Sequence, residues 1–100
     1  MEQFAVLAIL EAKAGMEQAV EEFLTSALPL VRSETGTVAW YALRFGPSTF
    51  GIFDTFTDQG GREAHLSGAV AEALLARAGD LFVSTPIIEQ PEILAVTSRR

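Results

Sequence analysis

The chain has 100 residues and a formal net charge of −6, and 49% of its residues are hydrophobic. This length suits a single domain, residues 1–100, with a buried core, and the apolar content is too high for a disordered segment. The acidic charge disfavours nucleic acid and anionic membranes as partners, and the absence of cysteine excludes disulfides, thiolate-bound metals and a thiol nucleophile.

The first predicted element is a strand over residues 3–12. Its centre, Phe4 to Leu10, is apolar at successive positions, which is typical of a strand buried on both faces. This run is too short to span a bilayer, and Glu2 before it has the wrong charge for a secretory signal. We therefore expect a cytoplasmic protein without a membrane segment.

An amphipathic helix is predicted to follow from Met16. Apolar side chains recur there at the helical spacing i, i+3 and i+4, and acidic side chains lie off that stripe. The apolar set is Met16, Ala19, Val20, Phe23, Leu24, Ala27 and Leu28. Pro29 lacks a backbone N–H and predicts a kink or a fresh turn, and residues 33–37 are predicted to form a loop.

A β-hairpin is predicted next, because two segments rich in β-branched and aromatic residues, 38–45 and 49–56, flank the turn sequence 46–48. The period of two in the second strand places four side chains on one face: Phe50, Ile52, Asp54 and Phe56. Asp54 is the only charged residue of that strand. A carboxylate on an apolar face needs a partner or water, because burying it unpaired is costly.

A helical region is predicted after the hairpin. Asp58 can cap a helix whose body is residues 62–66. Gly68 interrupts this helix. A second helical segment over residues 69–78 is predicted to end at Gly79.

The last predicted strand covers residues 87–96, and Pro91 places it at a sheet edge or a bulge. The order strand, helix, strand, strand, helix, strand predicts an α+β, ferredoxin-like fold with a four-stranded antiparallel sheet. The helices can cover only one face of such a sheet, whereas residues 4–10 are apolar on both faces. We therefore expect a second copy of the chain on the other face, in a homodimer.

His65 is the only histidine, and so the one side chain that ordinarily titrates near neutral pH and can act as a proton shuttle. It follows Asp54 by eleven residues on the returning helix, which makes an Asp54–His65 hydrogen bond possible, and we predict this contact. The alternatives are a histidine on the helix surface, and an aspartate at the solvated end of its strand or capping a backbone donor. A His-rich metal site is excluded.

Trp40 and Tyr41 are consecutive on a predicted strand and therefore point to opposite faces. Core or dimer packing is the favoured interpretation for both, and a cavity wall is the alternative. Arg44 shares the face of Trp40 and could pair with Asp54 or with a ligand oxygen, although a solvated arginine at a strand end is the commoner outcome.

Three segments together resemble the antibiotic biosynthesis monooxygenase family of dimeric α+β barrels. In residues 50–67 an acidic residue, Asp54, ends a strand and His65 follows on the next helix, as in that family. The segment Ala12-Lys13-Ala14-Gly15 resembles the family's start of the first helix, and Gly36-Thr37-Val38-Ala39-Trp40-Tyr41 resembles its loop into the second strand. The resemblance covers nearly the whole chain and implies a dimeric α+β barrel.

Members of that family include cofactor-independent oxygenases of aromatic polyketides and quinols, haem-degrading enzymes, and enzymes acting on small signalling carbohydrates. Asp54 takes the place usually held by Glu, and His65 matches the family histidine. The chain has no asparagine, so the Asn used by the polyketide-oxidising and haem-degrading members is missing, which disfavours haem cleavage.

The resemblance implies an oxidoreductase: a cofactor-independent monooxygenase for a small hydrophobic aromatic or quinol-type substrate, with no metal or other cofactor. In this hypothesis His65 takes the proton of the substrate and Asp54 orients the imidazole. The candidates for substrate binding are Trp40, Tyr41, Phe53 and Arg44. The alternative is a non-catalytic ligand-binding or stress-related dimer whose pocket keeps the shape without the chemistry.

Overall fold

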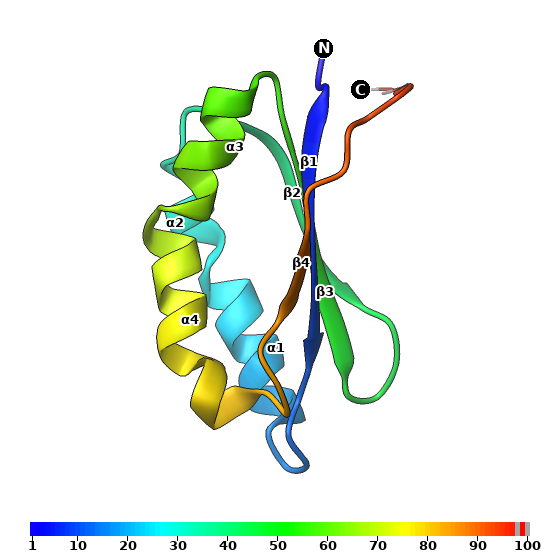
Figure 1. Cartoon of the computed structure of the whole chain (residues 1–100). Helices are drawn as coiled ribbons and strands as arrows, with labels where there is room; N and C mark the ends of the chain where they lie inside the picture. The colour runs from blue at the N-terminus through cyan, green and yellow to red at the C-terminus, as the bar shows by residue number, and fades with distance from the viewer. Residues whose placement is uncertain (98, 100) are drawn as a thin grey trace.

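The computed structural model describes residues 1–97 and residue 99. Its four strands form one antiparallel sheet in the order β2-β3-β1-β4, and the helices lie together on one face of that sheet (Figure 1). This is the α+β, ferredoxin-like arrangement that the element order predicts. The elements are β1 (Phe4–Glu11), α1 (Glu17–Ser26), α2 (Leu28–Arg32), β2 (Thr37–Arg44), β3 (Thr49–Phe56), α3 (Gln59–Leu66), α4 (Ala69–Leu81) and β4 (Ile87–Glu89).

The chain begins a fresh helix at Leu28, directly before Pro29, which agrees with one of the two outcomes predicted for this proline. Helix α1 ends at Ser26, and Ala27 is the cap residue of both α1 and α2. Pro29 lies in the first turn of α2, where a backbone N–H would have no partner inside the helix. The missing N–H of proline therefore costs the helix no hydrogen bond. As a result, the loop before β2 is short and leaves α2 close to α4.

The predicted end of α4 at Gly79 is wrong, because the helix continues to Leu81. Leu81 and Phe82 are both buried in the core, with exposures of 0% and 2%. Burying two large side chains stabilises the last turn by more than the roughly 1 kcal/mol that a glycine costs inside a helix. The Nζ of Lys13 also donates a hydrogen bond to the carbonyl oxygen of Gly79, at 2.6 Å.

The last strand is shorter than predicted, since β4 ends at Glu89 rather than near residue 96. Pro91 cannot donate to a sheet ladder, and regular pairing stops before it. Beyond this point the chain follows β1 through separate contacts. The amide of Ala5 donates to the carbonyl oxygen of Pro91 at 3.0 Å, and the amide of Ile93 donates to Gln3 at 2.8 Å.

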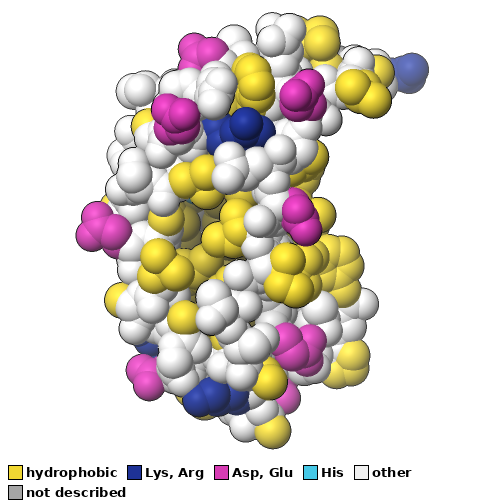
Figure 2. Space-filling view, in the orientation of Figure 1, with side chains coloured by type: hydrophobic (Ala, Val, Ile, Leu, Met, Phe, Trp, Pro, Cys, Tyr) yellow, Lys and Arg dark blue, Asp and Glu magenta, His cyan; other side chains and the backbone are white. Residues whose placement is uncertain are grey.

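The two faces of the sheet differ sharply. The face under the helices holds the core, which consists of Ala8, Leu10, Ala12, Val20, Leu24, Phe50, Ile52, Leu74, Leu81 and Phe82. The other face has no helix over it (Figure 1), and Figure 2 shows hydrophobic side chains along that side. Tyr41, Phe45 and Ile87 are each more than half exposed there, and Tyr41 stacks on Phe53 with ring centroids 6.4 Å apart. We call this surface the open sheet face.

None of the helices in the part of the chain that the structure describes combines the length and the apolar composition needed to cross a membrane.

The start of α3 yields the first testable prediction. Asp58 is the N-cap, as predicted, and its Oδ1 accepts a hydrogen bond from the amide of Gly61 at 2.8 Å. We expect Asp58→Ala to lower the free energy of unfolding by about 1 kcal/mol, measured by urea denaturation at fixed protein concentration. Asp80→Ala, which removes an exposed carboxylate of α4 that caps no helix, should change stability much less. Equal effects of the two substitutions would contradict this role.

Candidate functional site

Asp54 and His65 meet between the sheet and α3, as the sequence predicts. The Oδ2 of Asp54 lies 2.7 Å from the Nε2 of His65, and the two side chains are 0% and 7% exposed. The contact has the distance of an ion pair without the alignment of a hydrogen bond, so both oxygens of Asp54 lack a hydrogen-bond donor within residues 1–97 and 99. The cost of burying the Asp54 carboxylate is therefore offset by its contact with one imidazole.

The local structure explains how this pair forms. Asp54 lies in the central strand β3, opposite Val6 of β1 and Trp40 of β2, and its side chain points under the helices. The chain leaves β3, and Asp58 caps the N-terminus of α3. Helix α3 then returns over the sheet and places His65 above Asp54. The ring of Phe56 lies 5.3 Å from the imidazole and closes one side of the contact.

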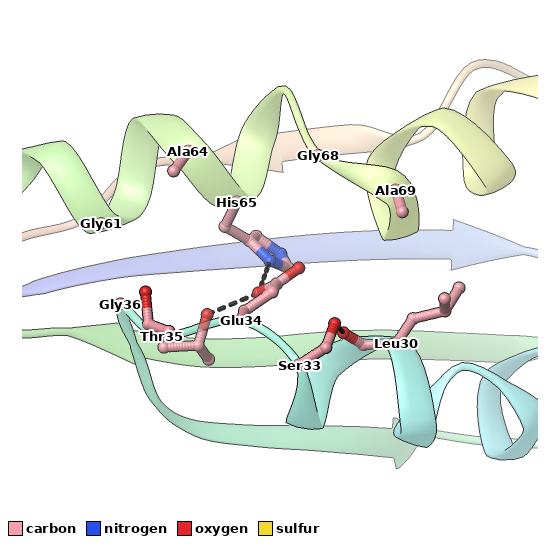
Figure 3. A pocket seen from close by; sticks show the side chains of 11 residues that line it. Leu30, Ser33, Glu34, Thr35, Gly36, Gly61, Ala64, His65, Gly68 and Ala69 are labelled. Atoms are coloured by element: carbon pink, nitrogen blue, oxygen red, sulfur yellow. Dashed lines mark hydrogen bonds and ion pairs between the residues drawn. The ribbon is translucent and has the colours of Figure 1, made fainter.

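A second carboxylate, Glu34, contacts the other nitrogen of His65, and the sequence analysis missed it. Its Oε1 lies 2.7 Å from the Nδ1 of His65 and also accepts a hydrogen bond from the hydroxyl of Thr37 at 2.5 Å (Figure 3). The Glu34 side chain is 18% exposed. The imidazole is thus bracketed by carboxylates on both sides, and we call Glu34, His65 and Asp54 the carboxylate–imidazole trio.

Two glycines bring Glu34 to His65. A Cβ added to Gly36 would lie 2.8 Å from the Cα of Gly61, and one added to Gly61 would lie 2.9 Å from the carbonyl oxygen of Gly36. Side chains at these positions do not allow such an approach, so the loop before β2 can touch the first turn of α3 only because both residues are glycine. The signal in the sequence was this pair of glycines, but nothing in one sequence shows that they meet.

His65 and Asp54 hold their protons more tightly than isolated side chains do. Burial by itself lowers the pKa of His65, but the contacts with Asp54 and then with Glu34 outweigh burial and leave that pKa raised above its ordinary value. Burial also raises the pKa of Asp54, which the His65 contact opposes only in part. Protonation of His65 is therefore favoured by both of its carboxylate partners.

The trio lies beside a pocket of about 300 Å³, a volume at the lower end of the range for small-molecule sites. Figure 3 shows the pocket between the end of α2, the loop to β2 and the α3–α4 corner, with His65 and Glu34 in its wall. Its other lining residues are Leu30, Ser33, Thr35, Gly36, Thr37, Gly61, Ala64, Gly68 and Ala69. On the sheet side a much smaller cavity, about 30 Å³, touches Asp54 and His65 among apolar side chains.

Only one of the other predicted site residues lies near the trio. Trp40 lies under the helices beside Asp54, with its Nε1 buried and without a hydrogen-bond partner in the described part of the chain. It lines a cavity of about 200 Å³ that Glu34 also borders. The indole is therefore a neighbour of the trio rather than part of the larger pocket.

The remaining three candidates lie elsewhere. Tyr41 and Phe53 are on the open sheet face, separated from His65 by the sheet itself, so they cannot line the same pocket within one chain. Arg44 does not pair with Asp54. Its guanidinium forms an ion pair with Glu21 of α1 and lies over the ring of Phe50, 4.6 Å from the centroid.

The raised pKa values generate a prediction about pH. In a histidine NMR titration we expect His65 to show a pKa above 6.5, and Asp54→Asn to lower it, because the neutral amide no longer stabilises the imidazolium. The folded chain binds protons at His65 and Asp54 more tightly than the unfolded chain does. The stabilisation from Asp54 is therefore lost as pH rises above about 3.8 and that from His65 as pH rises above about 6.5, so the free energy of unfolding should fall over both ranges.

The control for this titration is Glu72→Gln, which removes an exposed carboxylate of α4 and should leave the histidine pKa unchanged. A pKa of His65 at or below 6.5 in the parent chain would contradict the prediction. So would an unfolding free energy that rises over this pH range and keeps the same slope in Asp54→Asn.

Comparison with known proteins finds one relative of high sequence identity and several distant ones that share the fold. No family model matches the chain, and no curated protein matches it. A solved structure of a protein of unknown function from Nitrosomonas europaea is 53% identical, with a TM-score of 0.96 over 100% of this chain and 97% of that one.

More distant solved structures share the fold. A "putative antibiotic biosynthesis monooxygenase" from Nitrosomonas europaea is 14% identical, with a TM-score of 0.83 over 96% of this chain and 94% of that one. Another protein described in the same words, from Caulobacter crescentus, is 15% identical, with a TM-score of 0.79 over 94% of this chain and 92% of that one. The chain therefore belongs to the same family as the Nitrosomonas europaea protein of unknown function, and its fold is the α+β fold of the antibiotic biosynthesis monooxygenase-like proteins.

Proposed function

We propose that the protein is a cofactor-independent monooxygenase that acts on a small aromatic or quinol-type substrate. The observation that supports this best is the buried imidazole of His65, held between two carboxylates in the wall of a pocket of about 300 Å³. A proton acceptor with a raised pKa beside a small-molecule pocket is the arrangement that general-base chemistry needs. The pocket volume favours a substrate of one or two rings.

The proposed reaction needs only the substrate and dioxygen. The trio takes the hydroxyl proton of an electron-rich phenol or quinol, and the electron pair that spreads into the ring attacks dioxygen from a ring carbon that carries one hydrogen. One oxygen atom becomes the new carbonyl of the product, and the other leaves as water with the two hydrogens: AH₂ + O₂ → A=O + H₂O. The negative charge of Asp54 stabilises the imidazolium form of His65 during the transfer.

Oxygen uptake tests this function. The purified protein would be mixed with a panel of one- to three-ring quinols and anthrone-like phenols in an oxygen electrode, and the product would be analysed after reaction in ¹⁸O₂. The proposal expects one oxygen consumed per substrate and one labelled atom in the product. Formation of one hydrogen peroxide per oxygen would instead show a simple oxidase, and no uptake above the uncatalysed rate would contradict catalysis.

The role of His65 gives a prediction for a responsive substrate. Glutamine can donate its amide N–H to a carboxylate partner but cannot take up a proton near neutral pH, so we expect His65→Gln to lower kcat/KM by about 10²- to 10⁴-fold. Alanine is a poorer substitution at position 65, because it would leave the fully buried carboxylate of Asp54 without a partner.

The matched control for this substitution is Ser67→Ala, two residues away on the exposed side of the same helix end. It should retain the parent activity. Full activity of His65→Gln, or a loss that merely follows unfolding in circular dichroism, would contradict the catalytic role of His65.

We also propose that the protein is a homodimer, in which a second copy covers the open sheet face. Tyr41, Phe45 and Ile87 are 51%, 58% and 59% exposed on this one surface, a concentration of large apolar side chains that water solvates poorly. A twofold partner would offer the same apolar surface and bury both. Tyr41 and Phe53 would then serve the interface.

Sedimentation equilibrium provides the test of the dimer. We expect a dimer at micromolar concentration, and we expect Ile87→Asp to shift it to monomer because the new charge would be buried in the interface. Leu75→Asp is the control, since Leu75 is equally exposed, at 60% against 59%, but lies on α4 in the helical layer. A stable parent monomer, or equal dissociation by the two variants, would remove this proposal.

A non-catalytic ligand-binding role is the second candidate, and one observation favours it: both ring nitrogens of His65 already contact carboxylates, so neither is free. In that case the trio would hold the loop before β2 against α3 and shape the pocket. Saturable binding of a phenol without oxygen uptake would select this function.

A further inference from the structure

We propose that Glu34, rather than His65, is the residue that touches the substrate: the free Oε2 of its carboxylate receives the proton of an aromatic hydroxyl. The pocket would therefore select phenols over their methyl ethers. The reaction that follows this proton transfer rests on the proposed function, whereas binding of the phenol by Glu34 is argued from the geometry of the pocket alone.

Both ring nitrogens of His65 are already occupied by carboxylates. Nδ1 contacts the Oε1 of Glu34 and Nε2 contacts the Oδ2 of Asp54, each at 2.7 Å. A proton entering the trio from a ligand must therefore arrive at a carboxylate. Asp54 is fully buried, whereas Glu34 lines the larger pocket and is 18% exposed. Glu34 is thus the end of the row that a ligand can reach.

The free oxygen of Glu34 carries the second step. Oε1 is occupied by His65 and Thr37, but Oε2 is buried and has no hydrogen-bond donor within residues 1–97 and 99. In Figure 3 the second oxygen of Glu34 points along the pocket toward the Gly68 corner, and it lies 3.8 Å from where a Cβ on Gly68 would be. A buried carboxylate oxygen without a donor lowers stability, and a ligand hydroxyl at this place would relieve the cost.

The chemical step at Glu34 is a balanced proton transfer. The O–H bond of the phenol breaks, its proton goes to the Oε2 of Glu34, and the electron pair stays on the phenol oxygen and spreads into the ring. Glu34 gives up its negative charge as the ligand gains one, so the net charge of the carboxylate and the ligand together does not change. The imidazole keeps its contact with Oε1 throughout. A methyl ether has no such proton and leaves Oε2 unpartnered.

Binding of two probes tests this assignment without requiring catalysis. 1-Naphthol and 1-methoxynaphthalene differ by one methyl group, and their dissociation constants can be measured by fluorescence titration under nitrogen. We expect the parent protein to bind 1-naphthol about 10- to 100-fold more tightly, the usual effect of a hydrogen bond to a charged group. In Glu34→Gln this preference should fall to about threefold or less, whereas the control Glu72→Gln should keep it.

A second variant guards against misfolding of the first. Glu34→Asp keeps the charge but withdraws the carboxylate by one methylene, so it should also lose most of the preference while circular dichroism shows the parent fold. An undiminished preference in the folded Glu34 variants would overturn the assignment, and so would a parent protein that binds neither probe saturably. An intact, Glu34-dependent preference without any oxygen uptake would support Glu34 as the contact residue and reject the monooxygenase.

Discussion

The structure depends above all on a fully buried aspartate in the central strand of a small sheet. A charge at this depth is tolerated only with a nearby opposite charge, and His65 is the group that supplies it. This requirement fixes where α3 must lie over the sheet and which of its faces points inward. It also leaves the imidazole enclosed by two carboxylates and the ring of Phe56.

The loop before β2 completes this arrangement from a distant part of the chain. Glu34 reaches His65 because Gly36 and Gly61 let two backbones approach more closely than side chains would permit. The resulting row of three titratable groups runs from the pocket wall into the core, from a partly exposed carboxylate to a fully buried one.

The two faces of the sheet have separate roles. The helical face contains the core, the trio and the pocket, whereas the open sheet face gathers aromatic and aliphatic side chains without any helix over them. The same strand alternation that buries Asp54 directs Phe53 and Thr55 to the other side. A partner on that side would therefore stiffen β3, the strand that carries Asp54, without entering the pocket.

Local patterns were sufficient for the fold and for two of the three members of the trio. Strand alternation placed Asp54 among apolar side chains, the helix cap at Asp58 set the start of α3, and the pairing of Asp54 with His65 followed because a buried carboxylate needs a partner. Glu34 was not predictable, since its contact with His65 spans 31 residues and depends on two glycines meeting in space. Likewise, the continuation of α4 past Gly79 and the ion pair of Arg44 with Glu21 were decided by packing against distant segments. Periodicity records which face a side chain occupies, but only the packed chain determines which groups from different elements share that face.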